Sequence, residues 1–451
     1  MNKPDVIAVI DSGKTNKKVL LFDAEYKVLN EETVTFPETN DEDGFPCEDI
    51  RLLKKYISET ISQLSRNNDV NWKAINFSAY GASLVHIDEN GRELTPLYNY
   101  LKPCPPHLQE ELLRIYGGSD KFCTEVSSPM LGSLNSALQL LRLKREQPGI
   151  FDRIHFSLHL PQYLSWLVNN QPVSDLTSIG CHTLLWDFSK KAYHRWVSDE
   201  GISSKLAPLA DSSRTFPVTL NGKTIQCGIG LHDSSAALIP YLVLDPARFI
   251  LVSTGTWNIT LNPFNSDPLT AAEIESGCLY YLSYSGNPVK AARLFAGRLH
   301  DKFCDRIAAH FNLKKGFYKN ISFDPHLLSD CNAIPGEIPD PETFNPAIFN
   351  SVEEAYHFLV SVLVEQQLGC IRLVQNDNSI NRIYVDGGFS RNEIFMRLLA
   401  ERLPAYKIFA AEVPQATALG AALSIHDSWN PLPILNNLVK LTFFPHRQFE
   451  K

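Results

Sequence analysis

The sequence lacks the patterns typical of membrane, secreted and nucleic-acid-binding proteins. No apolar run approaches the roughly eighteen residues of a membrane span. The first residues lead straight into an apolar β run, with no charged-then-apolar secretory pattern. The nine cysteines contain no C-x-x-C pair, which favours reduced thiols packed as small hydrophobes. We therefore expect a cytoplasmic chain that makes no membrane contact.

Basic runs and metal motifs are also missing. No basic run exceeds a pair or triplet, and the formal net charge is −8, which argues against nucleic acid or an anionic membrane as the main partner. The thirteen histidines form neither an H-E-x-x-H nor a Cys/His zinc pattern. A protein-ligated transition metal is not expected, and a small molecule is the expected partner.

What is present is an alternation of strand and helix patterns over 451 residues, 44% of them hydrophobic. This alternation predicts an α/β protein with helix-flanked sheets, and the length predicts two or three domains. An opening strand–turn–strand pattern returns at residues 247–261. We interpret this as a duplicated architecture with one domain over residues 1–243 and a second over residues 244–451.

The opening stretch "VIAVIDSGKTNKKVLLFD", residues 6–23, ends its first strand like a phosphate-binding P-loop. A P-loop needs a glycine five residues before Gly13, but Ala8 stands there, inside the strand. An apolar β run follows where a P-loop has a helix. The stretch therefore predicts a β-hairpin whose tip, around Asp11 to Lys18, is either an ordinary turn or a phosphate and metal site.

Three other turns follow predicted strands. The second hairpin carries Ser253 to Thr256 at its tip, Gly387-Gly388 ends a strand before a helix, and Asp233 lies at a strand-to-helix turn. Aspartate is a common helix N-cap, and that role alone would explain Asp233. Paired with Asp11 at a shared sheet edge, however, it could serve phosphoryl transfer, one carboxylate holding Mg²⁺ and one taking a proton.

Five motifs occur in order along nearly the whole chain: D-x-G, G-x-x-D-x-x-A-A, S-T-G-T-W, D-G-G-x-S-R-N and A-T-A-L-G-A-A. This series resembles the FGGY family of carbohydrate kinases. The resemblance implies two ribonuclease-H-like domains of the actin-like ATPase group around a central cleft, with the sugar bound by the N-terminal domain and ATP by the C-terminal domain. Within the family, "FSAYGASLVHIDENG" and "VSTGTWNIT" resemble the subgroup that phosphorylates L-rhamnulose.

The resemblance also implies roles for individual residues. Asp233 would be the catalytic base, and Asp11, together with Asp233, would hold Mg²⁺. The phosphates would be surrounded by residues of the two hairpin tips: Gly13, Thr15, Asn16, Lys18, Thr254, Gly255 and Thr256. The adenosine would be flanked by Gly387, Gly388, Phe389, Asn392, Pro414 and Ala418. The sugar pocket would be lined by Tyr80, Gly81, Ser83, His232 and Asp233.

Departures from the family pattern leave the substrate open. Ser83 stands where the L-rhamnulose subgroup presents an acidic side chain, which removes a strong acceptor for sugar hydroxyls. We expect an ATP-dependent kinase of a ketose such as L-rhamnulose, with L-fuculose, xylulose or another ketose or polyol as alternatives. An actin-like sensor that binds sugar or nucleotide without turnover is the alternative from another class. We expect a monomer or a homodimer.

Overall fold

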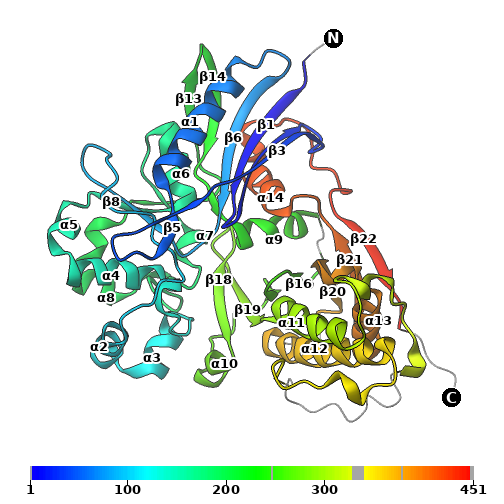
Figure 1. The fold of residues 1–451 in the computed structure, drawn as a ribbon. Helices are drawn as coiled ribbons and strands as arrows, with labels where there is room; N and C mark the ends of the chain where they lie inside the picture. The colour runs from blue at the N-terminus through cyan, green and yellow to red at the C-terminus, as the bar shows by residue number, and fades with distance from the viewer. Residues whose placement is uncertain (1–2, 245–246, 328–339, 377–378, 447–451) are drawn as a thin grey trace. The chain divides into compact units, whose positions relative to one another are not determined.

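The computed structural model describes residues 3–244, 247–327, 340–376 and 379–446 (Figure 1). Internal contacts divide the chain into two compact units. Unit 1 comprises residues 1–244, 268–288 and 414–438, and unit 2 comprises residues 245–267, 289–413 and 439–451. The first passage between units lies next to the boundary expected at residue 243, and the roles expected of the two domains remain predictions.

Unit 1 is built on a mixed sheet that begins with the expected hairpin. β1 (Asp5–Ser12) pairs antiparallel with β2 (Asn16–Asp23), which pairs with β3 (Val28–Thr35). β6 (Asn71–Ala79) runs parallel to β1, and β15 (Leu231–His232) runs parallel to β6. β14 (Lys223–Gly228) and β13 (Thr215–Leu220) complete the strand order β13-β14-β6-β1-β2-β3. The tip of the first hairpin has three residues, so the P-loop alternative is excluded.

Helices cover both faces of this sheet. α1 (Ile50–Arg66) and α6 (Leu160–Asn169) share an apolar core with Val6, Ala8 and Ile10 of β1. α14 (Ala416–Ser424) packs on β1 and β6, and α9 (Asp233–Leu244) packs on α14. Side chains alternate between the two faces of a strand. Asp11 is the neighbour of Ile10 in β1 and therefore points to the opposite face, where α14 packs and where Thr417 donates a hydrogen bond to it.

The remaining elements of unit 1 form smaller pieces around this sheet. They are β4 (Glu38–Asn40), β5 (Pro46–Glu48), β7 (Leu84–Ile87), α2 (Pro106–Tyr116), α3 (Gly118–Glu125), α4 (Ser136–Glu146), α5 (Pro148–Arg153), β8 (Phe156–His159), β9 (Ser174–Asp175), α7 (Leu176–Ile179), β10 (Trp186–Asp187), β11 (Ala192–Tyr193), α8 (Arg195–Asp199), β12 (Leu209–Ala210), α10 (Ala271–Glu275) and β18 (Cys278–Leu282).

Unit 2 repeats the strand pairing of unit 1. β16 (Ile250–Thr254) and β17 (Asn258–Asn262) form the expected second hairpin, and β17 pairs antiparallel with β19 (Pro288–Leu294). β20 (Arg382–Gly387) runs parallel to β16, and β21 (Lys407–Glu412) runs parallel to β20. β22 (Lys440–Phe444) lies at the edge. The helices are α11 (Ala296–His310), α12 (Val352–Val374) and α13 (Glu393–Arg402).

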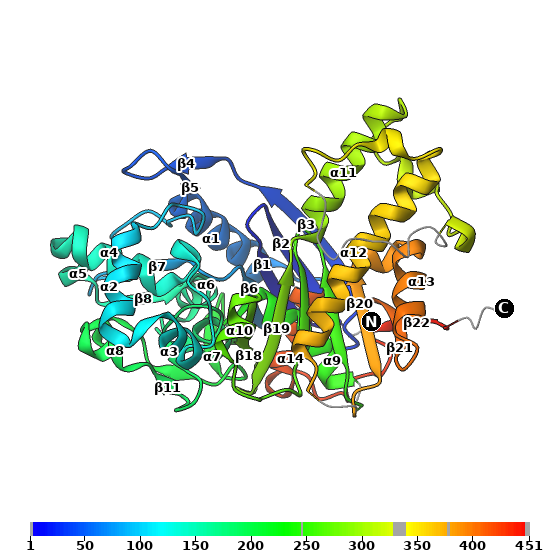
Figure 2. The same ribbon diagram turned by 90° about the horizontal axis from the view of Figure 1, so that it is seen from below.

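Among the described residues, α12 is the one helix long and apolar enough to cross a membrane. In its most apolar window 67% of the residues are buried inside the protein. It packs against α11, α13 and β17 (Figure 2). The length and composition of α12 therefore fit a buried helix in the core of unit 2 as well as they fit a membrane span.

Candidate active site

Three parallel strands of unit 1 end at one edge of the sheet. Asp11 near the end of β1 lies opposite Ser78 of β6, and Leu231 of β15 pairs with the same Ser78. Asp233 follows β15 directly and begins α9. The carboxyl ends of parallel strands form the usual ligand crevice of an α/β sheet. The structure thus brings together the two aspartates that sequence motifs more than two hundred residues apart had singled out.

Asp233 has the properties of a proton acceptor. Its side chain retains 30% exposure, and its Oδ1 accepts hydrogen bonds from the Ser234 amide at 2.6 Å and the Ser234 hydroxyl at 3.2 Å. Burial nevertheless raises the pKa of Asp233 from 3.8 to about 6, against the opposing effect of those hydrogen bonds. A base whose pKa lies near the working pH is both ionised and able to take a proton.

Asp11 lies within electrostatic range of Asp233. Burial and then the negative charge of Asp233 raise the pKa of Asp11 to about 6, while a 2.7 Å hydrogen bond from the Thr417 hydroxyl lowers it. Two carboxylates that repel each other suit a divalent cation. Mg²⁺ takes oxygen ligands and keeps several waters or phosphate oxygens, so it needs only one or two carboxylates from the protein. The donor set of Asp11 and Asp233 therefore fits Mg²⁺.

His232 packs beside the candidate base. Its Nε2 lies 3.2 Å from Oδ1 of Asp233 and 3.3 Å from Sγ of Cys181. Burial lowers the pKa of His232 to about 4, so the ring is neutral at pH 7. Gly81 lies against this ring, because a Cβ added there would come within 2.8 Å of it. His232 and Gly81 thus lie beside Asp233, and their place in a sugar pocket remains a prediction.

Two residues expected in the sugar pocket are committed to the protein interior. Ser83 is 1% exposed, and its hydroxyl donates to the carbonyl of Tyr98 at 3.3 Å. The hydroxyl of Tyr80 donates to Oε2 of Glu48 at 2.8 Å. Each hydroxyl can still accept a hydrogen bond, and the sugar contacts expected of these two side chains remain predictions. Tyr100 is better placed, because the negative charge of Asp233 adds to burial in raising its pKa.

The three lysines of the first hairpin have different partners. Lys14 pairs with Glu38 at 3.0 Å, and Lys17 is buried against Glu48 at 2.6 Å. Lys18 donates to Oε1 of Gln415 at 2.8 Å and lies 3.3 Å from Glu31. Its side chain keeps 26% exposure, so it can still reach an anion. Thr15 and Asn16 are exposed at the tip, and Gly13 is half-buried.

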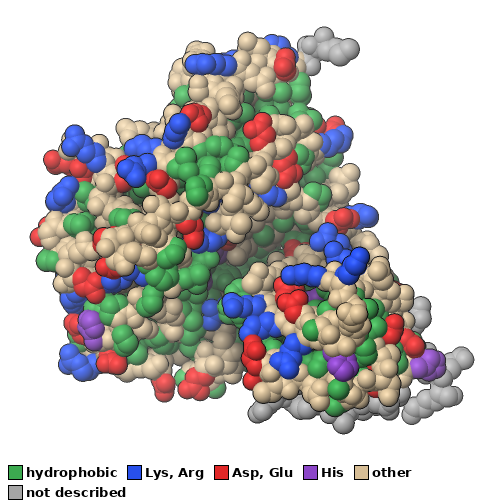
Figure 3. Space-filling view, in the orientation of Figure 1, with side chains coloured by type: hydrophobic (Ala, Val, Ile, Leu, Met, Phe, Trp, Pro, Cys, Tyr) green, Lys and Arg blue, Asp and Glu red, His purple; other side chains and the backbone are tan. Residues whose placement is uncertain are grey.

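Unit 2 holds a cavity of about 970 Å³ at the end of its own parallel strands. Its lining includes five residues predicted from the sequence: Gly255, Thr256, Gly388, Phe389 and Asn392. It also includes Gly297, His300, Asp301, Tyr318, Lys319, Asn320, Ile321, Ser322, Arg391 and Glu393. The volume is ample for a nucleotide. Figure 3 shows basic and acidic side chains interspersed on the face of this unit that the view presents, and the cavity lining likewise holds Lys319 and Arg391 beside Asp301 and Glu393.

Thr254 and Gly387 shape this cavity without lining it. The hydroxyl of Thr254 donates to the carbonyl of Asp386 and accepts from the amide of Phe389 at 2.9 Å. Gly387 has a φ of +79°, and a Cβ there would lie 1.8 Å from the carbonyl oxygen of Thr254. Only glycine fits this approach. The Thr254 hydroxyl thus ties the end of β16 to the turn after β20, and its expected place beside the phosphates remains a prediction.

Pro414 and Ala418 belong to unit 1, not to the unit that carries this cavity. Ala418 lies on α14 and is completely buried. The role expected of Pro414 and Ala418 beside the adenosine remains a prediction. Small residues in this motif allow close helix packing, since a Cβ on Gly420 would lie 1.8 Å from the carbonyl oxygen of Ala236 in α9.

Sequence reasoning missed several residues of these sites. Thr417 lies inside the A-T-A-L-G-A-A motif, whose only polar side chain could have marked it. Gly297 was marked by no pattern, although a Cβ there would lie 2.1 Å from the carbonyl oxygen of Gly255. His300 and Tyr318 meet edge to face with ring centroids 4.7 Å apart, and neither lies in a turn motif.

The chain thus has two units with matching strand pairing, one carrying Asp11 and Asp233 at a sheet edge and the other a cavity large enough for a nucleotide. The model of the N-terminal domain of the FGGY family of carbohydrate kinases matches residues 6–239, and the FGGY C-terminal domain model matches residues 246–431. The chain belongs to the FGGY family and is a carbohydrate kinase.

Its relatives are similar over most of their length. A rhamnulokinase from Halalkalibacterium halodurans is 22% identical over 91% of each chain, and one from Oceanobacillus iheyensis is 22% identical over 77% of each. A carbohydrate kinase structure from Novosphingobium aromaticivorans superposes with a TM-score of 0.78 at 23% identity, over 98% of this chain and 97% of the other. A xylulose kinase from Lactobacillus acidophilus gives 0.76 at 15%, over 98% and 94%. The expected two-domain actin-like fold is confirmed.

Proposed function

We propose that this kinase transfers a phosphate from ATP to a hydroxyl of a small ketose, with Asp233 as the general base. The observation that carries the proposal is the pair Asp11 and Asp233 at one sheet edge, both with a pKa raised to about 6. Two buried carboxylates close to each other destabilise the folded protein unless a cation or a proton neutralises part of their charge. The presence of Asp11 and Asp233 at one sheet edge therefore supports a catalytic use.

Asp233 then has two tasks, as proton acceptor and as one of two Mg²⁺ ligands, and each other group has a single task. Asp233 accepts the proton of the attacking sugar hydroxyl, and the neutral ring of His232 borders the base. Asp11, with Asp233, holds Mg²⁺, which would neutralise charge on the transferred phosphate. Thr15, Asn16 and Lys18 supply donors to that phosphate, and the unit 2 cavity around Gly255, Gly388 and Phe389 holds the nucleotide.

For the sugar we propose a ketose such as L-rhamnulose. Support comes from the relatives named rhamnulokinase and from the rings around the base, where His232 and Tyr281 lie 5.8 Å apart and Tyr100 lies near Asp233. Aromatic walls suit the apolar face and methyl group of a deoxy sugar. The buried Ser83 offers no acid to a sugar hydroxyl, so L-fuculose and xylulose are the alternatives to be tested beside it.

The test is sugar-dependent release of ADP over a panel of ketoses and polyols, with Asp233→Asn as the critical variant. Loss of a general base lowers turnover by about a hundredfold or more, while nucleotide affinity stays near that of the wild type. Asp187→Asn is the matched control, because Asp187 is a buried aspartate that accepts turn hydrogen bonds from Ser189 and Lys190. Near-normal turnover in Asp233→Asn would refute the assignment. Nucleotide binding without any sugar-dependent turnover would favour the sensor.

A further inference from the structure

Lys17 is a buried lysine whose ammonium holds the carbonyl groups of the first hairpin tip. The residue is 2% exposed. Its Nζ donates to the carbonyl oxygen of Gly13 at 2.9 Å and to that of Lys14 at 3.4 Å, and lies 2.6 Å from Oε1 of Glu48. Of the three protons of the ammonium, two are donated to these carbonyl groups, and the Glu48 carboxylate lies at ion-pair distance. Buried in this way, the ammonium is not exposed to a phosphate.

Glu48 continues the chain of contacts into the site edge. It ends β5 and is 5% exposed. Its other oxygen accepts from the hydroxyl of Tyr80 at 2.8 Å, and the amide of Tyr80 donates to the carbonyl of Ser12 at 3.3 Å. The three side chains therefore connect the tip of the first hairpin to the segment that leaves β6 beside His232.

Because a peptide group is planar, the hydrogen bonds from Lys17 to the two carbonyl groups also fix the direction of the N–H groups in the same peptide units. In a trans peptide the carbonyl and the following N–H point in opposite directions. When Lys17 holds the carbonyls of Gly13 and Lys14, the amides of Lys14 and Thr15 are aimed away from it. Among the described residues neither amide donates to another group. Two neighbouring amides without a partner inside the protein are available to an anion such as a phosphate oxygen.

We propose that Lys17 is a positioning residue that aims the amides of Lys14 and Thr15 at the transferred phosphate, and that Glu48 holds Lys17 in place for this task. The inference rests on the proposed role of the tip at that phosphate. A buried ion pair is a weak source of stability, because two matched apolar residues often serve as well. Lys17 thus contacts phosphate only through the backbone that it orients.

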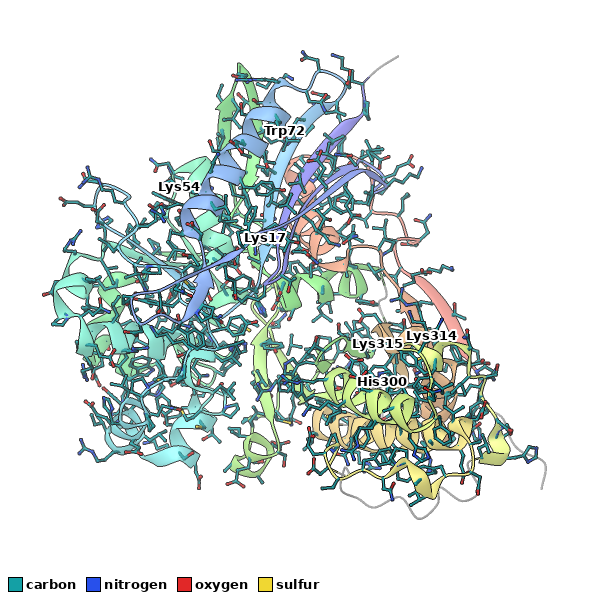
Figure 4. The ribbon with its side chains drawn as sticks, in the orientation of Figure 1. Lys17, Lys54, Trp72, His300, Lys314 and Lys315 are labelled. Atoms are coloured by element: carbon teal, nitrogen blue, oxygen red, sulfur yellow. The ribbon has the colours of Figure 1, made fainter. Side chains whose placement is uncertain are left out.

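The structure contains a second Lys–Glu–Tyr group that serves as a control. Lys54 lies 2.7 Å from Oε1 of Glu93, which accepts from the hydroxyl of Tyr163 at 2.6 Å. This group joins α1 to a turn and to α6 in the same unit, with no contact to the hairpin tip. Figure 4 shows Lys17 at the strands and Lys54 on the helix.

The variants are Lys17→Met, Glu48→Gln and the double variant, with Lys54→Met and Glu93→Gln as controls. For each, the Mg²⁺-dependent affinities for ATP and ADP are measured without sugar, and KM and kcat with sugar. We expect Lys17→Met to weaken the binding of ATP relative to that of ADP by about tenfold or more. This is the size of effect expected when hydrogen bonds from the tip amides to a charged phosphate are lost. KM for ATP rises, and KM for sugar changes by less than about threefold on the same basis. The control variants keep the wild-type ratio.

The double variant separates positioning from stability. It removes both buried charges, so it folds even where a single variant leaves one charge unpaired, and we expect it to bind ATP no better than Lys17→Met. A wild-type ratio of ATP to ADP affinity in the double variant would overturn the inference, as would a double variant that fails to fold. Sugar-dependent ADP release by the wild type tests the proposed function separately, since the affinity ratio needs no sugar.

Discussion

A single methyl group added at Gly420 should lower the rate of phosphate transfer. The Cβ of Gly420→Ala would lie 1.8 Å from the carbonyl oxygen of Ala236 and 2.6 Å from its carbon. Both atoms are backbone, so no side-chain rotation relieves the contact. Cβ atoms essentially never approach closer than 3.0 Å, so α9 and α14 must separate there by about 1.2 Å or more, and close-packed interiors resist such shifts.

This shift acts on Asp233 because Ala236 lies one turn into the helix that Asp233 begins. Thr417 on α14 is bonded to Asp11, so separating the helices moves the two aspartates relative to each other. A misplacement of about 1 Å can lower a rate by about a hundredfold. Overpacking of this kind destabilises by roughly 1–3 kcal/mol. We therefore expect kcat/KM of Gly420→Ala to fall by up to about a hundredfold, while the protein still folds with a lower free energy of unfolding.

The assay is sugar-dependent ADP release together with urea unfolding of the purified variants. Gly369→Ala is the control, because Gly369 lies inside α12 with nothing within 4 Å of its added Cβ. Alanine there should stabilise by about 0.5–1 kcal/mol, through higher helix propensity, without affecting turnover. A Gly420→Ala enzyme with wild-type kcat/KM and stability would refute the reasoning.

Three further predictions use the charges of unit 1. In Asp11→Ala the Mg²⁺ concentration for half-maximal activity should rise by about tenfold or more, the loss of one charged ligand; an unchanged Mg²⁺ titration would show that Asp11 is no ligand. With a pKa of about 6 for Asp233, kcat/KM of the wild type should fall as the pH drops through about 6, and a flat profile from pH 7.5 to 5 would contradict the base assignment. Burial lowers the pKa of His86 to about 4 from 6.5, so its share of stability is complete above pH 6.5 and is lost as the pH falls toward 4. From pH 7.5 to 4.5 the wild type should lose about 2–3 kcal/mol of unfolding free energy more than His86→Gln, and equal losses in urea titrations would exclude this contribution.

Local signals allowed much of the fold to be predicted. Two apolar β runs on either side of a polar tip in residues 6–23 predicted the first hairpin, and helical spacing predicted α12 with the observed ends. Asp11 and Asp233 were found because both follow apolar strands, and parallel strands end at a common edge. These inferences needed only neighbouring residues and a general rule of sheet topology.

Side-chain partnerships across long sequence distances could not be predicted. A lysine in a polar tip looks solvated, and only the structure shows Lys17 buried against Glu48. Ser83 and Thr254 follow strands as site residues do, but their hydroxyls are used by carbonyls elsewhere in the chain. Composition cannot distinguish a hydroxyl that faces a ligand from one that faces the backbone.

The chain passes between the units five times, and the last passages decide when unit 1 is complete. Residues 414–438 contribute α14, which packs on both β1 and α9. During synthesis the first 244 residues therefore emerge long before the helix that covers one face of their sheet. A fragment ending at residue 243 would leave that face bare and prone to association. Cutting this protein at its apparent midpoint should yield an incomplete first half, whereas joining residues 1–244 to 414–438 restores the missing layer.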